Sequence, residues 1–214
     1  MTAVDKPLYI EQGATFRLGF TWHAEGPVVD GVVTPGQALN LNGCAARMQI
    51  RASQGSAILV SATSETTGDG ADRIYLGDLT GRVVVTLTDE DTDLLAVSTA
   101  VYDLEVVWPL ARVEQVSVTS GLIVVTGAAG MFMTSDIGGA VTGANIPANT
   151  TIVSIAANGS TATLSAAASG TSAAEEITIT NAQPGDRPHV DRVLKGGVTV
   201  DPNLTQVGDE PIVV

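Results

Sequence analysis

The clearest predicted strand of the chain lies between residues 14 and 22, where large apolar residues occupy every second position. Successive side chains of a strand point to opposite faces, so this period of two predicts one buried and one exposed face. The same alternation runs through residues 44–51 and 101–108. The inward positions of the first strand are Phe16, Leu18, Phe20 and Trp22.

Shorter strands and turns fill much of the rest of residues 1–111. Stretches rich in β-branched residues predict three more strands. They are 57–63, 73–76 and 82–87. Residues 26–43 are rich in Gly, Pro and Asn, which predicts a long loop. With a further strand at 192–200, this series of short strands favours an all-β fold, an antiparallel immunoglobulin-like β-sandwich.

One short helix is predicted to begin after Thr88. The Thr88 hydroxyl can cap the first turn, and Asp91 can bond back to the Thr88 amide, which is a capping box. The acidic run from Asp89 to Asp93 also allows a calcium site, because hard oxygen ligands suit that ion. The EF-hand spacing is missing, and acidic residues are stabilised at a helix N-terminus by its dipole. The run is therefore predicted to be structural.

An inserted segment separates two blocks of this pattern. No Lys or Arg occurs between Arg112 and Arg187, and Thr, Ser, Ala, Gly, Val and Ile dominate there. We predict a discontinuous host sandwich, residues 1–111 plus 187–214, with an Ala/Thr/Gly-rich β domain of residues 112–186 inserted before its last strand. Strands 101–108 and 192–200 should then pair antiparallel, because the ends of an insertion must lie close together.

The insertion has a strand pattern of its own and is predicted to form a compact barrel or sandwich. Its candidate strands are 115–118, 122–126, 140–143, 150–155, 161–165 and 176–180. Asn158 and Gly159 predict a tight hairpin turn. Small side chains dominate this segment, so residues 131–133, Met-Phe-Met, are expected to supply its bulky apolar cluster.

Composition excludes several partners. The net charge is −13, which repels phosphate backbones, so no nucleic acid partner is expected. The apolar run at 122–125 is far too short to span a bilayer, and residues 1–6 do not resemble a signal peptide. A single cysteine, Cys44, fits synthesis in a reducing compartment. No membrane partner is expected.

Catalytic chemistry has few candidates in this sequence. His23 and His189 are the two histidines, and neither lies in a metal-binding spacing. Cys44 has no partner histidine in the pattern, so it is predicted to be a small buried residue rather than a nucleophile. The glycine-rich stretch 138–143 lacks the lysine of a phosphate-binding loop. We expect no enzyme activity, no cofactor and no metal.

Five segments of the host block resemble the amino-terminal domain of phage baseplate upper proteins and small virion proteins related to it. They are residues 8–17, 41–51, 81–87, 101–106 and 192–202, taken in order along the chain. The insertion is similar to Ala/Thr-rich β modules of phage tail and fibre proteins through residues 135–143 and 145–153. The resemblance implies a tailed-phage virion protein, made in the host bacterial cytoplasm and located in the virion.

The function implied by this resemblance is that of a non-enzymatic structural component of the particle, a tail or baseplate adaptor or minor tail protein. Its partners would then be other virion proteins. Two alternatives remain open: a capsid decoration or head-fibre protein, and a carbohydrate-binding adhesin whose inserted domain contacts a host surface glycan.

The C-terminal segment is the candidate assembly contact. Its apolar end has no evident place in the predicted sandwich and could add a strand to a neighbouring copy, although a frayed terminus is an equal alternative. A homo-oligomer is expected, with a trimer favoured. The candidate contact residues are Leu204, Val207, Ile212, Val213 and Val214.

Overall fold

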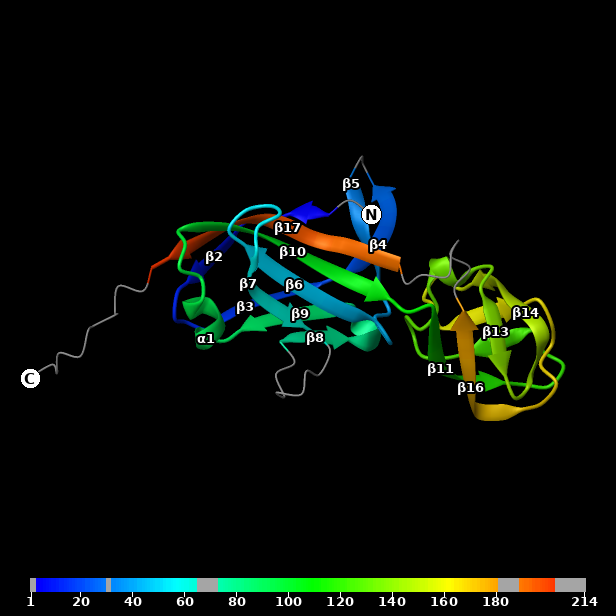
Figure 1. Cartoon of the computed structure of the whole chain (residues 1–214). Helices are drawn as coiled ribbons and strands as arrows, with labels where there is room; N and C mark the ends of the chain where they lie inside the picture. The colour runs from blue at the N-terminus through cyan, green and yellow to red at the C-terminus, as the bar shows by residue number, and fades with distance from the viewer. Residues whose placement is uncertain (1–2, 30–31, 65–72, 181–188, 203–214) are drawn as a thin grey trace, which may run out of the picture.

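The computed structural model describes residues 3–29, 32–64, 73–180 and 189–202. The fold is all-β, as predicted, and Figure 1 shows two sheets packed as a sandwich beside a smaller barrel. The immunoglobulin-like topology stays a prediction. We refer below to the two-sheet part as the sandwich and to residues 111–180 as the barrel.

The larger sheet of the sandwich has the strand order β1-β17-β10-β6-β7, and β2 also pairs with β17. Its strands are β1 (Val4–Asp5), β2 (Leu8–Glu11), β6 (Ala45–Arg51), β7 (Ile58–Thr63), β10 (Thr99–Trp108) and β17 (His189–Asp201). Ladders between β7, β6, β10 and β17 are antiparallel. This includes the predicted pairing of the two segments that flank the insertion, which is confirmed from Thr99↔Thr199 to Trp108↔His189.

Two pairings depart from the predicted antiparallel pattern. Both β1 and β2 lie parallel to β17, with Val4 opposite Leu194 and Leu8 opposite Val198. A strand of 13 residues is long enough to hold two short strands end to end. Pro7 separates them because proline has no amide hydrogen to donate to the ladder. Short edge segments of this kind leave little periodicity in the sequence, so pairing direction could not be predicted.

The smaller sheet has the order β3-β9-β8 and covers the larger one. Its strands are β3 (Phe16–Thr21), β8 (Ile74–Gly77) and β9 (Arg82–Leu87), with the short 3₁₀ turn η1 (Asp78–Thr80) between β8 and β9. Buried side chains of both sheets form one cluster, including Leu18 and Val85 from the smaller sheet and Met48 and Leu104 from the larger. The inward faces predicted from alternation therefore meet in a shared core.

The predicted long loop at 26–43 is wrong for most of its length. β4 (His23–Val29) and β5 (Val32–Ala38) pair antiparallel as a two-stranded ribbon that stands away from the sandwich in Figure 1. Backbone hydrogen bonds hold such a ribbon, so its sequence needs no apolar alternation. The helix prediction is confirmed: α1 (Asp89–Asp93) begins after Thr88, and the capping box with Asp91 is formed.

The inserted segment folds as a closed six-stranded barrel with the order β11-β12-β15-β14-β13-β16. Its elements are β11 (Ala111–Val118), β12 (Val124–Thr126), η2 (Thr134–Asp136), β13 (Ala140–Gly143), β14 (Ile146–Ile155), β15 (Thr161–Leu164) and β16 (Ser172–Thr180). Met131 and Phe132 pack among aliphatic side chains in a second cluster, as predicted, while Met133 is buried outside that cluster. Gly159 has φ +62° in the hairpin turn, a conformation that glycine adopts without strain.

Candidate functional site

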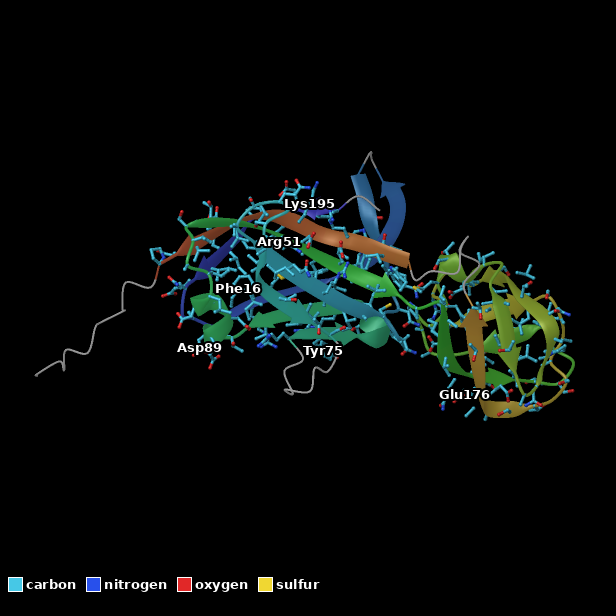
Figure 2. All side chains as sticks on the ribbon, viewed as in Figure 1. Phe16, Arg51, Tyr75, Asp89, Glu176 and Lys195 are labelled. Atoms are coloured by element: carbon cyan, nitrogen blue, oxygen red, sulfur yellow. The ribbon has the colours of Figure 1, made fainter. Side chains whose placement is uncertain are left out.

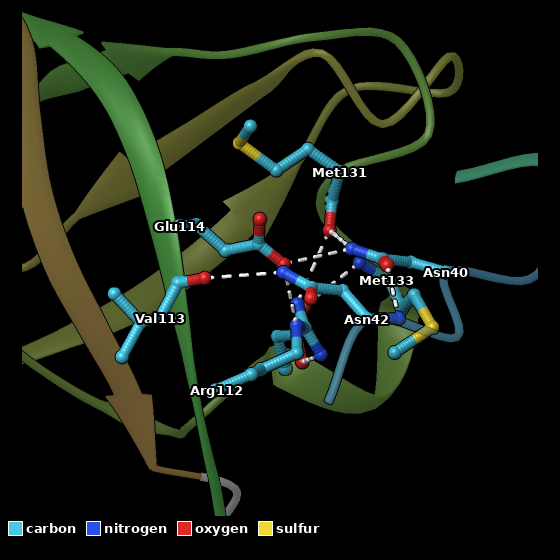
Figure 3. Close-up of polar contacts among 8 residues, drawn as sticks. Asn40, Asn42, Arg112, Val113, Glu114, Met131 and Met133 are labelled. Carbon is cyan, nitrogen blue, oxygen red and sulfur yellow. Dashed lines mark hydrogen bonds and ion pairs between the residues drawn. The ribbon is translucent and has the colours of Figure 1, made fainter. Parts of the chain in front are cut away.

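Asn40 joins the sandwich to the barrel. It lies in the loop between β5 and β6 and is 0% exposed. Its Nδ2 atom donates to the Glu114 Oε1 atom at 2.9 Å and to the Met131 carbonyl oxygen at 2.8 Å, both in the barrel (Figure 3). The Asn42 amide in turn donates to Asn40 Oδ1 at 2.9 Å, which fixes the side-chain orientation. The loop between β5 and β6 thus reaches into the end of the barrel that faces the sandwich.

Arg112 lies at the centre of the same contacts. Its guanidinium binds Asp136 in a bidentate manner, Nη1 to Oδ1 at 2.8 Å and Nη2 to Oδ2 at 2.6 Å. The Nε atom donates to Glu114 Oε1 at 3.1 Å, and Nη2 also donates to the Met131 carbonyl at 3.1 Å. We call Asn40, Arg112, Glu114, Asp136 and the Met131 carbonyl the joint.

The charged side chains of the joint are almost fully removed from solvent, with 2% of Arg112, 5% of Glu114 and 0% of Asp136 exposed. Burial disfavours the charged guanidinium, but the hydrogen bonds and charges of Asp136 and Glu114 outweigh it and raise the pKa of Arg112. Because each charge has hydrogen-bonded partners, the joint avoids the large penalty of a buried unpaired ion.

Alternation along β11 explains how the joint forms. The inward positions of this strand are Arg112, Glu114, Val116 and Val118, and all four are buried. The half of the strand nearest the sandwich therefore points polar groups inward, and the far half contributes to the apolar core. Asp136 ends η2, where its Oδ2 atom also accepts the Met133 amide at 2.8 Å. The barrel interior is thus polar at the end that meets the sandwich.

Close contacts surround the joint. The Asn42 Nδ2 atom donates to the Val113 carbonyl at 3.1 Å. A Cβ atom at Gly159 would lie 2.5 Å from Gln37 Nε2, so the hairpin turn of the barrel fits closely against β5. Leu79 of η1 packs on the apolar cluster of the barrel. Two separate stretches of the chain before the barrel, residues 37–42 and Leu79, thus contact it.

The candidates from sequence occupy scattered positions. His23 Nδ1 lies 3.0 Å from the Gly36 carbonyl, within the β4–β5 ribbon. Burial raises the pKa of Cys44 to about 12 despite the nearby Arg112 charge, so the thiol stays protonated at neutral pH. His189 belongs to β17, and its side chain lies outside the described part.

Asp91 of the acidic run makes structural contacts. Asp91 accepts the Thr88 amide at 3.0 Å and forms an ion pair with Arg73 at 3.0 Å. Across residues 3–29, 32–64, 73–180 and 189–202, no group of three or more His, Cys, Asp or Glu is placed to hold a metal ion.

The candidate assembly residues lie outside the described residues. They are Leu204, Val207, Ile212, Val213 and Val214.

The barrel surface carries almost no charge. Residues 111–180 contain five charged residues, and four of them are buried. Three belong to the joint, and Glu175 accepts hydrogen bonds from the Asn145 amide at 2.8 Å and its Nδ2 atom at 2.7 Å. These bonds lower the pKa of Glu175. Glu176, labelled in Figure 2, is the remaining one and is exposed.

Sequence reasoning missed the joint. The sequence held a signal. Arg112 is the nearest basic residue in sequence to both Glu114 and Asp136, which makes it a candidate ion-pair partner for each of them. Arg112 and Glu114 also share the inward period of Val116 and Val118. Charged residues at inward positions usually indicate a paired buried site.

No helix among the described residues is long and apolar enough to cross a lipid bilayer; α1 has five residues. Comparison with models of protein families finds no match, and comparison with curated protein sequences finds none either.

Proposed function

We propose that the protein is a non-enzymatic structural component of a tailed-bacteriophage particle, in which the sandwich attaches to other virion proteins and the barrel is presented as a contact module. A tail or baseplate adaptor is the favoured role. The observation that carries the presenting role is the joint, where a sandwich asparagine and three barrel side chains form one buried, fully paired cluster. The assignment to a phage particle rests on the sequence resemblance of the two blocks.

A buried, directional joint suits a presenting module. Hydrogen bonds between buried groups require defined distances and angles, so the joint favours one orientation of the barrel on the sandwich. The chain also enters and leaves the barrel beside the paired residues Trp108 and His189, at one end of the β10–β17 ladder. Together these features hold an otherwise separate barrel at one end of the sandwich.

A structural role agrees with the chemistry of the described residues. The charged side chains of the joint are buried, and their atoms are paired with one another rather than open to a substrate. A hollow of about 180 Å³ between β3 and β17 is lined mostly by apolar residues. These include Val4, Phe20, Trp22 and Val193. None of its lining residues is a nucleophile with a neighbouring base, as an acyl or phosphoryl transfer site would require.

Capsid decoration or a head fibre is an alternative with the same architecture, since either would also attach by one module and present the other. The adhesin alternative has less support. Phe132 is the one aromatic residue between 111 and 180, and it is 1% exposed. The barrel therefore lacks the exposed aromatic face on which sugar rings commonly stack.

Electron microscopy of intact particles tests the proposal. Particles carrying this protein with a small tag at the exposed barrel residue Ala144 should show the tag at a fixed, symmetric location on the tail, baseplate or capsid. Purified particles that lack the protein would contradict the proposal. A glycan array with the purified protein separates the adhesin alternative, because specific binding to a host polysaccharide would support it.

A further inference from the structure

Four large apolar side chains lie exposed together on one flank of the barrel. Leu122, Ile123 and Val124 are consecutive and are 54%, 45% and 42% exposed, and Val153 is 54% exposed. We call these four residues the barrel patch. Leu122 and Ile123 lie in the turn before β12, and Val124 begins that strand. Three exposed apolar residues in a row are unusual on a surface that faces solvent, and they indicate a contact surface.

Strand pairing brings the two parts of the barrel patch near each other. Val124 of β12 pairs with Thr163 of β15, which in turn pairs with Ser154 of β14. A register shift between Ile152 and Ser154 leaves both Val153 and Ser154 exposed. The Leu164 amide donates to the Ile123 carbonyl at 2.7 Å, which holds the start of the patch against β15. Neighbouring strands lie about 5 Å apart, so Val124 of β12 and Val153 of β14 are about 10 Å apart, on either side of β15.

Hydroxyl groups border the barrel patch. Thr126 of β12 and Ser154 of β14 are exposed beside the patch, and Thr163 of β15 is half-buried between these two strands. Glu176, the exposed charge of the barrel, lies on β16 and not on a patch strand. An apolar centre with an uncharged polar border is the usual composition of a protein interface.

We infer that the barrel patch is a homotypic contact, whose partner is the barrel patch of a second copy of this chain. Two identical faces meet across a twofold axis, so a border of like charges would repel itself. Hydroxyl groups both donate and accept hydrogen bonds, and a border of them is complementary to its own copy.

Charge favours the same partner. The chain has a net charge of −13, so most faces of two copies repel each other. Residues 115–174 contain one charged residue, Asp136, which is 0% exposed and paired with Arg112. The patch lies within this uncharged segment, and two barrels can therefore meet there without bringing like charges together. This inference is independent of the particle assignment.

The contact is expected to be weak between two free copies. A stable interface covers about 800 Å² on each partner, and four side chains supply only the centre of such an area. We expect a dissociation constant of about 1 mM or tighter for the full chain. In an assembly that holds many copies together, contacts of this strength add up through high local concentration.

Sedimentation equilibrium of the full chain and three variants tests the inference. Val153→Lys and Val153→Glu each place like charges across the contact and should weaken self-association roughly tenfold or more. An equal mixture of the two variants should restore association, because opposite charges then face each other. Val113→Lys is the matched control, since Val113 is 50% exposed but pairs with Thr178 of β16. It should associate like the unmodified chain.

Three results would overturn the inference. The first is a full chain that remains monomeric at about 1 mM. The second is equal weakening by Val153→Lys and Val113→Lys, which would indicate a general effect of charge. The third is no recovery in the mixture, which would indicate that the patch does not face its own copy. Circular dichroism of each variant confirms that the fold is kept.

Discussion

The sandwich and the barrel are both all-β, yet they distribute charge in opposite ways. The chain has 10 basic and 23 acidic residues, and only five of these lie in residues 111–180. The sandwich exposes charged residues such as Arg47, whereas the barrel buries four of its five and exposes Ser, Thr, Ala and Gly. Three of the five charged residues of the barrel lie where the two parts meet.

The two cores differ as well. Trp22 and Tyr102 contribute buried aromatic side chains to the sandwich, whereas Phe132 is the single aromatic residue of the barrel core and lies among aliphatic side chains. A closed barrel has no free sheet edge, and its interior is filled by side chains. The barrel therefore combines a mostly aliphatic core with the polar joint at one end.

Asp136→Asn should have the largest effect among single substitutions. It leaves the charge of Arg112 buried with only Glu114 as an ionic partner, so we expect a loss of about 3–5 kcal/mol in the free energy of unfolding. Urea unfolding followed by circular dichroism measures this loss. Glu176→Gln is the control, because the side chain is exposed on the same barrel and should change stability by less than about 0.5 kcal/mol. Equal effects of the two would mean that the joint does not stabilise the barrel.

Asn40→Ala should have a smaller effect. Glu114 Oε1 and the Met131 carbonyl would each keep a hydrogen bond from Arg112, so no buried acceptor is left unpaired. We expect a loss of about 1–2 kcal/mol in urea unfolding. Asn42→Ala removes an exposed hydrogen bond from the same loop and should change stability by less than about 0.5 kcal/mol. If Asn40→Ala has no greater effect than Asn42→Ala, the link between sandwich and barrel is weaker than its geometry indicates.

Thr88→Ala should affect the sandwich alone. It removes the side-chain acceptor of the capping box at α1, and we expect a loss of about 1 kcal/mol. Hydrogen exchange should speed up at α1 and the neighbouring β9 and stay unchanged at β14. Faster exchange throughout the barrel would show that the two parts unfold as one unit.

Glu175→Gln should have the smallest effect, a loss of stability near neutral pH that shrinks in acid. The folded pKa of Glu175 is lowered, chiefly by the hydrogen bond from the Asn145 amide. Its contribution to stability is therefore present above the ordinary value of 4.5 and lost as the pH falls through the lower folded pKa. The variant should show a weaker decline of stability over this range than the unmodified chain. An unchanged acid profile would contradict the role of this carboxylate.

Much of the fold could be predicted from residue alternation. It located the core strands of both parts because each has one buried face, as in β3 and β10. The β4–β5 ribbon was missed because backbone pairing alone needs no apolar period. The parallel pairing of β1 and β2 depends on contacts with a strand nearly 190 residues later, which local pattern does not encode.

The inward period of β11 marks Arg112 and Glu114 as buried, but it does not identify their partners. Asn40 and Glu114 are 74 residues apart, and Arg112 and Asp136 are 24 apart. Pairing over such separations is not encoded in local pattern. The barrel patch was visible in sequence as a short apolar run, but only the structure showed that the run is exposed.

Replacing residues 113–186 with a short Gly-Ser turn tests most directly whether the sandwich folds without the barrel. Trp108 and His189 are paired, so a short turn can close the gap, and Trp22 and Trp108 provide a fluorescence signal from the sandwich alone. The account predicts a cooperative urea transition for the truncated chain. A shortened protein with no cooperative transition would contradict the account, since the sandwich would then need the barrel to fold.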